Sequence, residues 1–122
     1  MNKFKILILI LIISSCNSNN GVSNIEIDNQ NIELGLLKIG DTINKSIFIN
    51  SIGKNEFKID SIGVSCGCTL VKYDKSPIPK DQSAEIKIRF IPNEKGKFNK
   101  SIVVEGNSDP PFNVFYLKGE VK

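Results

Sequence analysis

Histidine and tryptophan are absent from this sequence of 122 residues, and its single methionine is Met1. Without histidine the chain cannot form the Ser-His or Cys-His pairs that activate a nucleophile. A closed zinc site needs four ligands, and the imidazole donors for one are missing. No glycine-rich phosphate-binding loop is present either. We therefore expect a protein that is not an enzyme and that carries no cofactor.

A large excess of one charge is also lacking. The sequence has 16 basic and 13 acidic residues, for a net charge of +3. Two of the basic residues, Lys3 and Lys5, lie in the first 15 residues, so the rest of the chain is nearly neutral. Binding of nucleic acids requires a basic stripe that neutralises phosphates, and the sequence has none. We expect no nucleic-acid partner.

The start of the chain has the pattern of an export signal. Two lysines precede an apolar run at residues 6–13, which is too short to span a bilayer, since spanning takes about 20 residues. The motif Ile13-Ser14-Ser15-Cys16 follows and resembles the bacterial lipobox, whose cysteine receives diacylglycerol and then an acyl chain such as palmitate. We predict a lipoprotein signal peptide at residues 1–15 and lipid attachment at Cys16. The alternative is ordinary signal cleavage with the cysteine left free.

The residues that follow predict where the protein is held. Residues 16–23 are uncharged and mostly polar, as in a flexible tether between a lipid and a domain at residues 24–122. Asn17 is not the aspartate that retains some lipoproteins in the inner membrane, and no acidic cluster follows it. We predict a cell-envelope lipoprotein of the outer membrane that faces the periplasm. Its expected partners are the membrane, through the lipid, and an envelope protein; the oligomeric state is left open.

Short apolar runs recur along residues 24–122, between clusters rich in Gly, Pro, Asn and Asp. At Ala84–Phe90 apolar and charged residues alternate, so one face of a strand points inward. At Phe112–Val121 both faces are apolar, which predicts a strand that is covered on both sides or that turns a corner. The predicted strands are Asn24–Asp28, Ile32–Lys38, Ile43–Asn50, Glu56–Ile62, Cys68–Tyr73, Ala84–Ile91, Phe98–Glu105 and Phe112–Val121.

This spacing of short strands predicts an all-β fold. Residues 24–122 are enough for one domain with one hydrophobic core. We expect an immunoglobulin-like antiparallel β-sandwich of seven or eight strands. A jelly roll or a partial barrel is the alternative, because periodicity does not fix the order of the strands.

Several motifs then occur in order: a Gly35 turn, IGDT at 39–42, Asn-x-x-Gly at 50–53, SCGCT at 65–69, PIP at 77–79, GKFNKSI at 96–102 and LKGEV at 117–121. Together they make the chain from Ile32 to Val121 similar to the bacterial domain-of-unknown-function 1573 family. The resemblance implies an immunoglobulin-like sandwich related to Hydin-type and chaperone-pilin-type domains, often in lipid-anchored or exported proteins. It implies no activity. The family usually has a proline–glycine type turn where Lys80-Asp81 follows Pro79 here, which predicts an altered loop.

Cys66 and Cys68, separated by a single glycine, are the residues with the most chemistry. In an extended strand they would lie on one face about 6.6 Å apart, since each residue advances about 3.3 Å. A disulfide brings its Cβ atoms to about 3.5–4.5 Å. The bond therefore requires a tighter fold, which Gly67 permits because it can adopt a positive φ. A ring this short predicts a redox-active pair that is easily reduced.

Two other interpretations of Cys66 and Cys68 stay open. As thiolates they suit a soft metal ion such as Cu(I), with Asp60 or Asp74 as an oxygen donor. Alternatively, both cysteines are inert, because buried cysteine behaves as a small hydrophobic residue and Gly67 marks a bulge.

A weaker pattern concerns glycosylation. Asp41-Thr42-Ile43 and Asp60-Ser61-Ile62 match the Asp-Ser/Thr-aliphatic pattern of an O-glycosylation system of some diderm bacteria, with Thr42 and Ser61 as the acceptors. The alternative is that each triplet is a turn that leads into a strand.

These patterns predict a lipid-anchored, exported, immunoglobulin-like domain that acts as a non-catalytic binding or structural module of the cell envelope. A partner of such a module can engage a sheet edge, where main-chain hydrogen bonds supply the affinity. The alternative function is that of a thiol-redox or copper-handling protein that uses Cys66 and Cys68.

Overall fold

The computed structural model describes residues 21–122, so the predicted signal peptide and Cys16 lie outside the described residues. Within residues 21–122 no helix is long and apolar enough to cross a membrane. The described chain forms eight strands: β1 (Ile25–Ile27), β2 (Asn31–Leu37), β3 (Ile43–Ser51), β4 (Ile59–Val64), β5 (Thr69–Tyr73), β6 (Ser83–Phe90), β7 (Gly96–Gly106) and β8 (Phe112–Val121).

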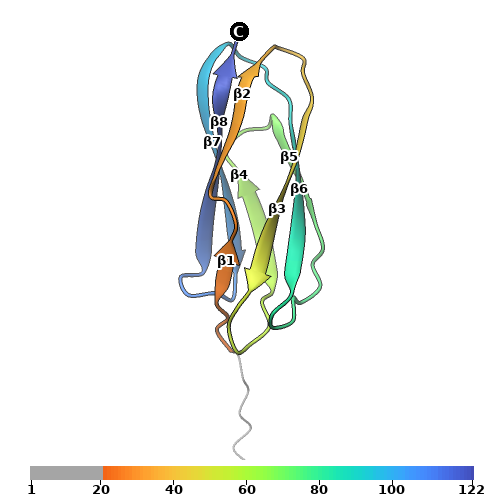
Figure 1. The fold of residues 1–122 in the computed structure, drawn as a ribbon, viewed down its shortest axis with the longest axis vertical. Coiled ribbons are helices and arrows are strands. Elements are labelled where there is room, and N and C mark those ends of the chain that lie inside the picture. Colours follow the sequence, from red (N-terminus) through yellow and green to blue (C-terminus); the bar gives the residue numbers. More distant parts are fainter. Residues whose placement is uncertain (1–20) are drawn as a thin grey trace, which may run out of the picture.

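The strands build two four-stranded sheets that pack face to face (Figure 1). One sheet has the order β1-β3-β6-β5 and the other the order β2-β8-β7-β4. Neighbouring strands run antiparallel except β2 and β8, which pair in parallel. The predicted two-sheet sandwich of seven or eight strands is confirmed with eight strands, and one of its pairs, β2–β8, is parallel rather than antiparallel.

The core lies between the sheets, where the inward side chains of both layers meet. Ile86, Ile88 and Phe90 on β6 are at most 2% exposed, as their alternation predicts. The two apolar faces of β8 differ in burial. Phe115 and Leu117 are fully buried, whereas Phe112 is 54% exposed. In the described structure the outer face of β8 is therefore open to solvent at Phe112 and Tyr116, so the first of the two predicted alternatives, cover on both sides, is wrong.

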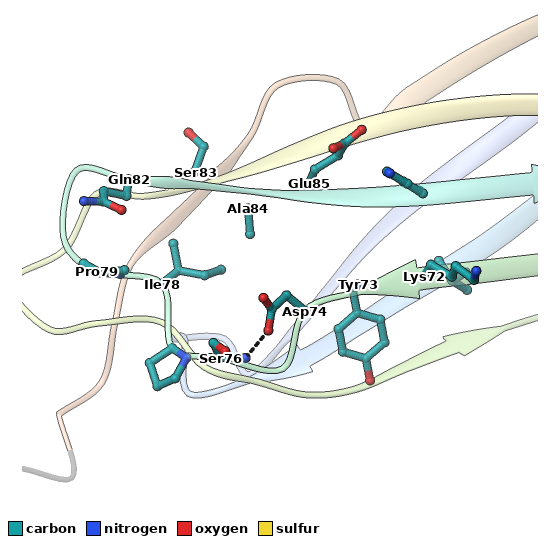
Figure 2. A pocket seen from close by; sticks show the side chains of 13 residues that line it. Lys72, Tyr73, Asp74, Ser76, Ile78, Pro79, Gln82, Ser83, Ala84 and Glu85 are labelled. Atoms are coloured by element: carbon teal, nitrogen blue, oxygen red, sulfur yellow. Dashed lines mark hydrogen bonds between the residues drawn. The ribbon is translucent and has the colours of Figure 1, made fainter.

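Strand β4 starts at Ile59, three residues later than predicted, because Phe57 pairs elsewhere. Phe57 and Ile78 exchange two backbone hydrogen bonds, of 2.9 and 2.7 Å, in an isolated antiparallel bridge. Ile78 belongs to the long connection from β5 to β6 and points into the hollow that this connection encloses (Figure 2). The fully buried Phe57 ring thus ties this connection to the core.

The same connection contains two polar turns. The Ser76 N–H donates a 2.8 Å hydrogen bond to Asp74 Oδ1 (Figure 2), and this bond, with that of the Ser76 hydroxyl, lowers the pKa of the Asp74 carboxyl. Asp81 has φ = 64°, in the left-handed region that short polar side chains tolerate better than most. Asp81 therefore supplies the left-handed residue of the turn that follows Pro79.

The N-terminal end of the described chain is held against the domain. Ser23, within the segment predicted as tether, is fully buried, and its N–H donates to Asn107 O at 2.8 Å. The side-chain amides of Asn107 and Asn55 donate to Gly21 O and Val22 O, each at 3.1 Å. The chain thus enters the sandwich at the end where β4 begins and β7 finishes.

Candidate functional site

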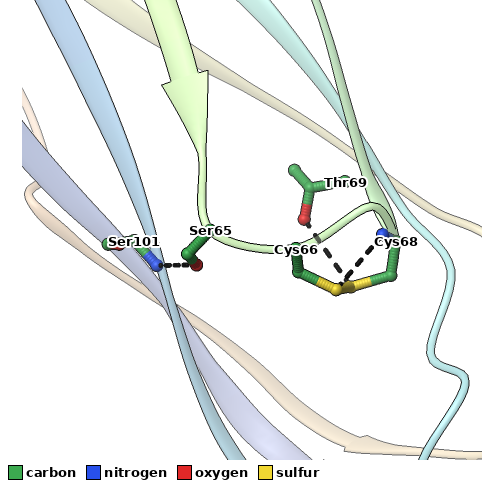
Figure 3. Close-up of a disulfide and its surroundings, with 5 residues drawn as sticks. All are labelled: Ser65, Cys66, Cys68, Thr69 and Ser101. Carbon is green, nitrogen blue, oxygen red and sulfur yellow. Dashed lines mark hydrogen bonds between the residues drawn. A yellow bond between two sulfur atoms is a disulfide. The ribbon is translucent and has the colours of Figure 1, made fainter.

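Cys66 and Cys68 lie in the short connection that carries the chain from β4 in one sheet to β5 in the other (Figure 3). Their sulfur atoms form a disulfide, and their Cα atoms are 5.1 Å apart. The Thr69 N–H donates to Cys66 O at 3.2 Å, which closes a four-residue turn. This turn, rather than an extended strand, brings the two cysteines within bonding distance.

Gly67 does not close the ring in the way predicted from the sequence. The glycines with positive φ in the described chain are Gly35, Gly40 and Gly96, and Gly67 is not one of them. A Cβ atom added at Gly67 meets no atom within 4 Å. The turn therefore needs neither the conformational freedom of glycine nor its small size at this position.

The two sulfur atoms have different surroundings. Cys66 is half-buried, whereas Cys68 is 8% exposed and belongs to the core. The Cys68 N–H donates to Cys66 Sγ at 3.1 Å, and Thr69 Oγ1 lies 4.0 Å from Cys68 Sγ (Figure 3). Cys66 is thus the more exposed residue of the pair.

Backbone hydrogen bonds fasten the turn to both sheets. On the β4 side, the Ser65 N–H donates to Ser101 O at 3.1 Å, and the Ser101 N–H donates back to Ser65 Oγ at 3.0 Å (Figure 3). On the β5 side, the Ile91 N–H donates to Cys68 O at 2.9 Å. The disulfide turn therefore fixes the residue at which β5 begins.

A metal site at Cys66 and Cys68 stays a prediction for the reduced protein, because disulfide sulfurs are not thiolate ligands. Among residues 21–122 there is no group of three or more His, Cys, Asp or Glu side chains that could hold a metal ion. The oxygen donors suggested from the sequence, Asp60 and Asp74, are exposed near the start of β4 and just after the end of β5. The described structure does not bring them to the sulfur atoms.

Strand β5 is a sheet edge, and its regularity distinguishes it from the other edges of the described sandwich. β1 is three residues long. β2 and β4 carry irregularities, between Glu33 and Gly35 and between Ile59 and Ser61 respectively. Short strands and bulges are devices that block pairing with another chain. β5 pairs with β6 in unbroken register along its whole length, so its free side has neither device.

The hydrogen-bond pattern shows which backbone groups face outward from β5. In an antiparallel pair, residues alternate between those that bond to the partner strand and those that do not. Because Cys68 O accepts from the Ile91 N–H, the alternation assigns Leu70 and Lys72 to bonds with β6. The N–H and C=O groups of Val71 and Tyr73 therefore point to the free side, and a partner strand can bond to them.

Side chains follow the same alternation. Val71 and Tyr73 face the space between the sheets and are half-buried, whereas Leu70 and Lys72 are exposed on the outer surface. The pattern of alternation in the sequence Thr69–Tyr73 predicts these faces. It gives no sign that the strand lies at an edge, and the sequence analysis therefore missed Val71 and Tyr73 as functional candidates.

The predicted glycosylation acceptors are far apart in the fold. Thr42 is exposed in the loop between β2 and β3. In the same loop the Asp41 carboxylate accepts a 2.8 Å hydrogen bond from the Lys38 N–H. Ser61 is exposed on β4, and its hydroxyl donates to Glu105 Oε2 at 3.1 Å. Both hydroxyls are on the surface, and modification of either stays a prediction.

A family model described as "Protein of unknown function (DUF1573)" matches residues 25–121. No curated protein matches the chain in sequence. Among solved structures, the chain is similar to a protein of unknown function from Porphyromonas gingivalis W83, with a TM-score of 0.72 and 18% identity over 80% of this chain and 46% of that one. The chain thus spans about half the length of that protein.

Two further structures have the same fold. PapD-like domain 7 of human CEP192 has a TM-score of 0.67 and 15% identity, over 80% of this chain and 84% of that one. The secreted serine protease VesC from Vibrio cholerae has a TM-score of 0.64 and 9% identity, over 84% of this chain and 24% of that one. At these identities the likeness concerns the fold alone, and it confirms the predicted immunoglobulin-like sandwich.

Replacing Gly67 with alanine should leave the disulfide intact, because the added methyl group meets open space and the backbone needs no positive φ. Alanine restricts the unfolded chain, so we expect the free energy of unfolding to rise by about 0.4–1 kcal/mol. Urea unfolding measures this change, and alkylation followed by intact mass counts free thiols. Gly40→Ala, at φ = 88°, is the control and should lower stability. Two alkylated thiols in Gly67→Ala would contradict this account of the turn.

Proposed function

This chain belongs to the DUF1573 family of proteins of unknown function, and we propose that it is a non-catalytic binding module of the cell envelope, exported and held by a lipid on Cys16. The observation that supports binding is the free side of β5, where the backbone groups of Val71 and Tyr73 are open to a partner strand. Adding a strand to an open edge gains affinity from main-chain hydrogen bonds. We infer that an envelope protein partner binds in this way.

The absence of histidine from the sequence supports the non-catalytic part of the proposal. The chain has no histidine to activate Cys66, Thr69 or any other nucleophile near the turn. Hydrogen bonds from Ser76 lower the pKa of the Asp74 carboxyl, which holds Asp74 as a carboxylate of low basicity. Neither feature suits acid–base catalysis near neutral pH.

The proposed anchoring would leave the site accessible to a partner. The described chain enters at the end where Gly21 O and Val22 O are bonded by Asn107 and Asn55. β4 runs away from that end for six residues before the disulfide turn. At about 3.3 Å per residue the turn lies roughly 20 Å from the point of entry. A lipid before that point would therefore place the turn away from the membrane, where an envelope partner can reach it.

Replacing Cys16 with serine in the full-length chain should remove the lipid and with it outer-membrane association. We expect the wild-type protein in the outer-membrane fraction, with an intact mass above that of the polypeptide from residue 16 by the lipid groups. If the protein is also O-glycosylated, its mass rises further by hexose units, and we expect peptide mapping to place these sugars on Thr42 or Ser61. Cys66→Ser/Cys68→Ser is the matched control and should stay lipidated. Wild-type protein that is soluble with an unmodified Cys16 would contradict the anchoring proposal.

A second candidate function, thiol–disulfide exchange, is favoured by the unequal exposure of the two cysteine residues. A thiolate of a partner dithiol would attack Sγ of the more exposed residue, Cys66, and Cys68 would leave as a thiolate. The second partner thiol would then form the partner's disulfide and release Cys66, whose thiolate the Cys68 N–H is placed to stabilise. The reduced pair is also the form in which copper handling would occur, since Cu(I) prefers thiolates.

The variant Cys66→Ser/Cys68→Ser separates the two functions. The disulfide closes a loop of three residues, so its loss should cost only about 1–2 kcal/mol of unfolding free energy. If the protein is a binding module, wild type and variant oxidise a reduced dithiol peptide equally poorly. One peptide disulfide formed per wild-type molecule, and none with the variant, would favour exchange over the non-catalytic proposal. Cys16→Ser, which retains the pair, is the control.

A further inference from the structure

The outer surface beside the β5 edge is positively charged. Lys72 on β5 lies directly opposite Lys87 on β6, and Leu70 lies opposite Arg89. All four side chains are exposed, and Leu70 is 57% exposed. These residues line one shallow groove together with Asn44 and Ser46 of β3. We call Lys72, Lys87 and Arg89 the basic row.

Cross-strand neighbours do not neutralise the basic row. The neighbours of Lys87 are Lys72 on one side and Ser46 on the other. Like charges placed directly opposite destabilise a sheet, so the Lys72–Lys87 pair costs the free domain stability. Two carboxylates lie near the row and line a hollow together with Lys72 and Lys87. Glu85 accepts a 2.7 Å hydrogen bond from the Ser46 hydroxyl, and Asp74 accepts a 2.8 Å hydrogen bond from the Ser76 N–H. The three cations of the basic row outnumber these two carboxylates, so the surface keeps a positive charge that can attract an anionic group from another molecule.

The segregation of charge is local. Without Lys3 and Lys5 the sequence has 14 basic and 13 acidic residues, so its overall charge is close to neutral. The grouping of Lys72, Lys87 and Arg89 on two adjacent strands is therefore not a consequence of the overall composition. Arg89 is also oriented, because its Nε donates to Asn44 Oδ1 at 3.3 Å. The charge therefore marks this side of the sandwich as one that attracts negative charge.

A strand added beside β5 would present its two sets of side chains to different surroundings. One set would face outward next to Leu70 and Lys72, with Lys87 one strand further away. The other set would face the seam between β5 and β4, where Tyr73 and Ile62 are half-buried and Val64 is 37% exposed. The outward positions suit carboxylates, and the inward positions suit apolar side chains.

We propose that the partner of the β5 edge is an extended acidic segment of another protein, in which carboxylate and apolar residues alternate. This inference rests on the proposed binding function and adds the chemistry of the partner. The segment's main chain bonds to Val71 and Tyr73, its apolar side chains cover the seam, and its carboxylates lie against the basic row. The disulfide turn sets the register, because it fixes the start of the strand to which the segment is added.

The test uses the full-length chain in a mild detergent and two labelled eight-residue peptides, one alternating glutamate and valine and the other alternating lysine and valine. Fluorescence anisotropy should show the acidic peptide binding at least tenfold more tightly, with an affinity that falls as salt is raised. Lys72→Glu/Lys87→Glu should reverse this preference. Lys95→Glu/Lys97→Glu changes the net charge equally at exposed residues away from β5 and is the matched control. Thermal unfolding checks that each variant is folded.

A third peptide separates this inference from the function on which it rests. The acidic peptide with alternate backbone amides N-methylated keeps its charge and loses strand pairing, and we expect it not to bind. Equal binding of the acidic and basic peptides would overturn the acidic partner and leave edge pairing standing. Undiminished binding of the N-methylated peptide would overturn edge pairing and indicate a site for anions in general. If no peptide binds, the lysines serve only to block the edge, and both proposals fail.

Discussion

Two sheets packed face to face leave four edge strands, each with backbone N–H and C=O groups that no neighbouring strand satisfies. The four edge strands of the described chain differ in what protects these backbone groups from pairing with another chain. β1 is short, and β2 and β4 are interrupted by bulges. Among these four, β5 combines a length of five residues with a ladder of unbroken register, whereas the regular ladder of β1 covers three residues. An open edge is a hazard in a protein without a partner and a binding surface in one that has a partner.

The disulfide turn and the β5 edge form one site. Cys68 is the residue at which the turn ends and the ladder to β6 starts, since its carbonyl accepts the Ile91 N–H. The bond between Cys66 and Cys68 keeps this junction tight, while Ser65 holds the other side of the turn to β7. The proposed binding edge and the disulfide thus lie within one short segment, residues 65–73, so experiments on the cysteine pair must measure both binding and thiol chemistry.

The sequence predicted what depends on local periodicity and missed what depends on strand order. The alternation in Ala84–Phe90 correctly identified Ile86, Ile88 and Phe90 as core residues. The start of β4 was misplaced because Phe57 pairs with Ile78, a partner outside the regular strands. Neither the parallel pair β2–β8 nor the edge position of β5 has a local signal. The role given to Gly67 failed because a turn, and not a positive φ, closes the disulfide ring.

Amide hydrogen exchange along β5, measured by NMR on the full-length chain, tests the central claim most directly. An N–H in the ladder to β6 is protected, and one that faces solvent exchanges freely. The account predicts slow exchange at Leu70 and Lys72 and fast exchange at Val71 and Tyr73, in strict alternation. Equal protection of all four amides in the free protein would show that the edge is already covered, and the account would then be wrong.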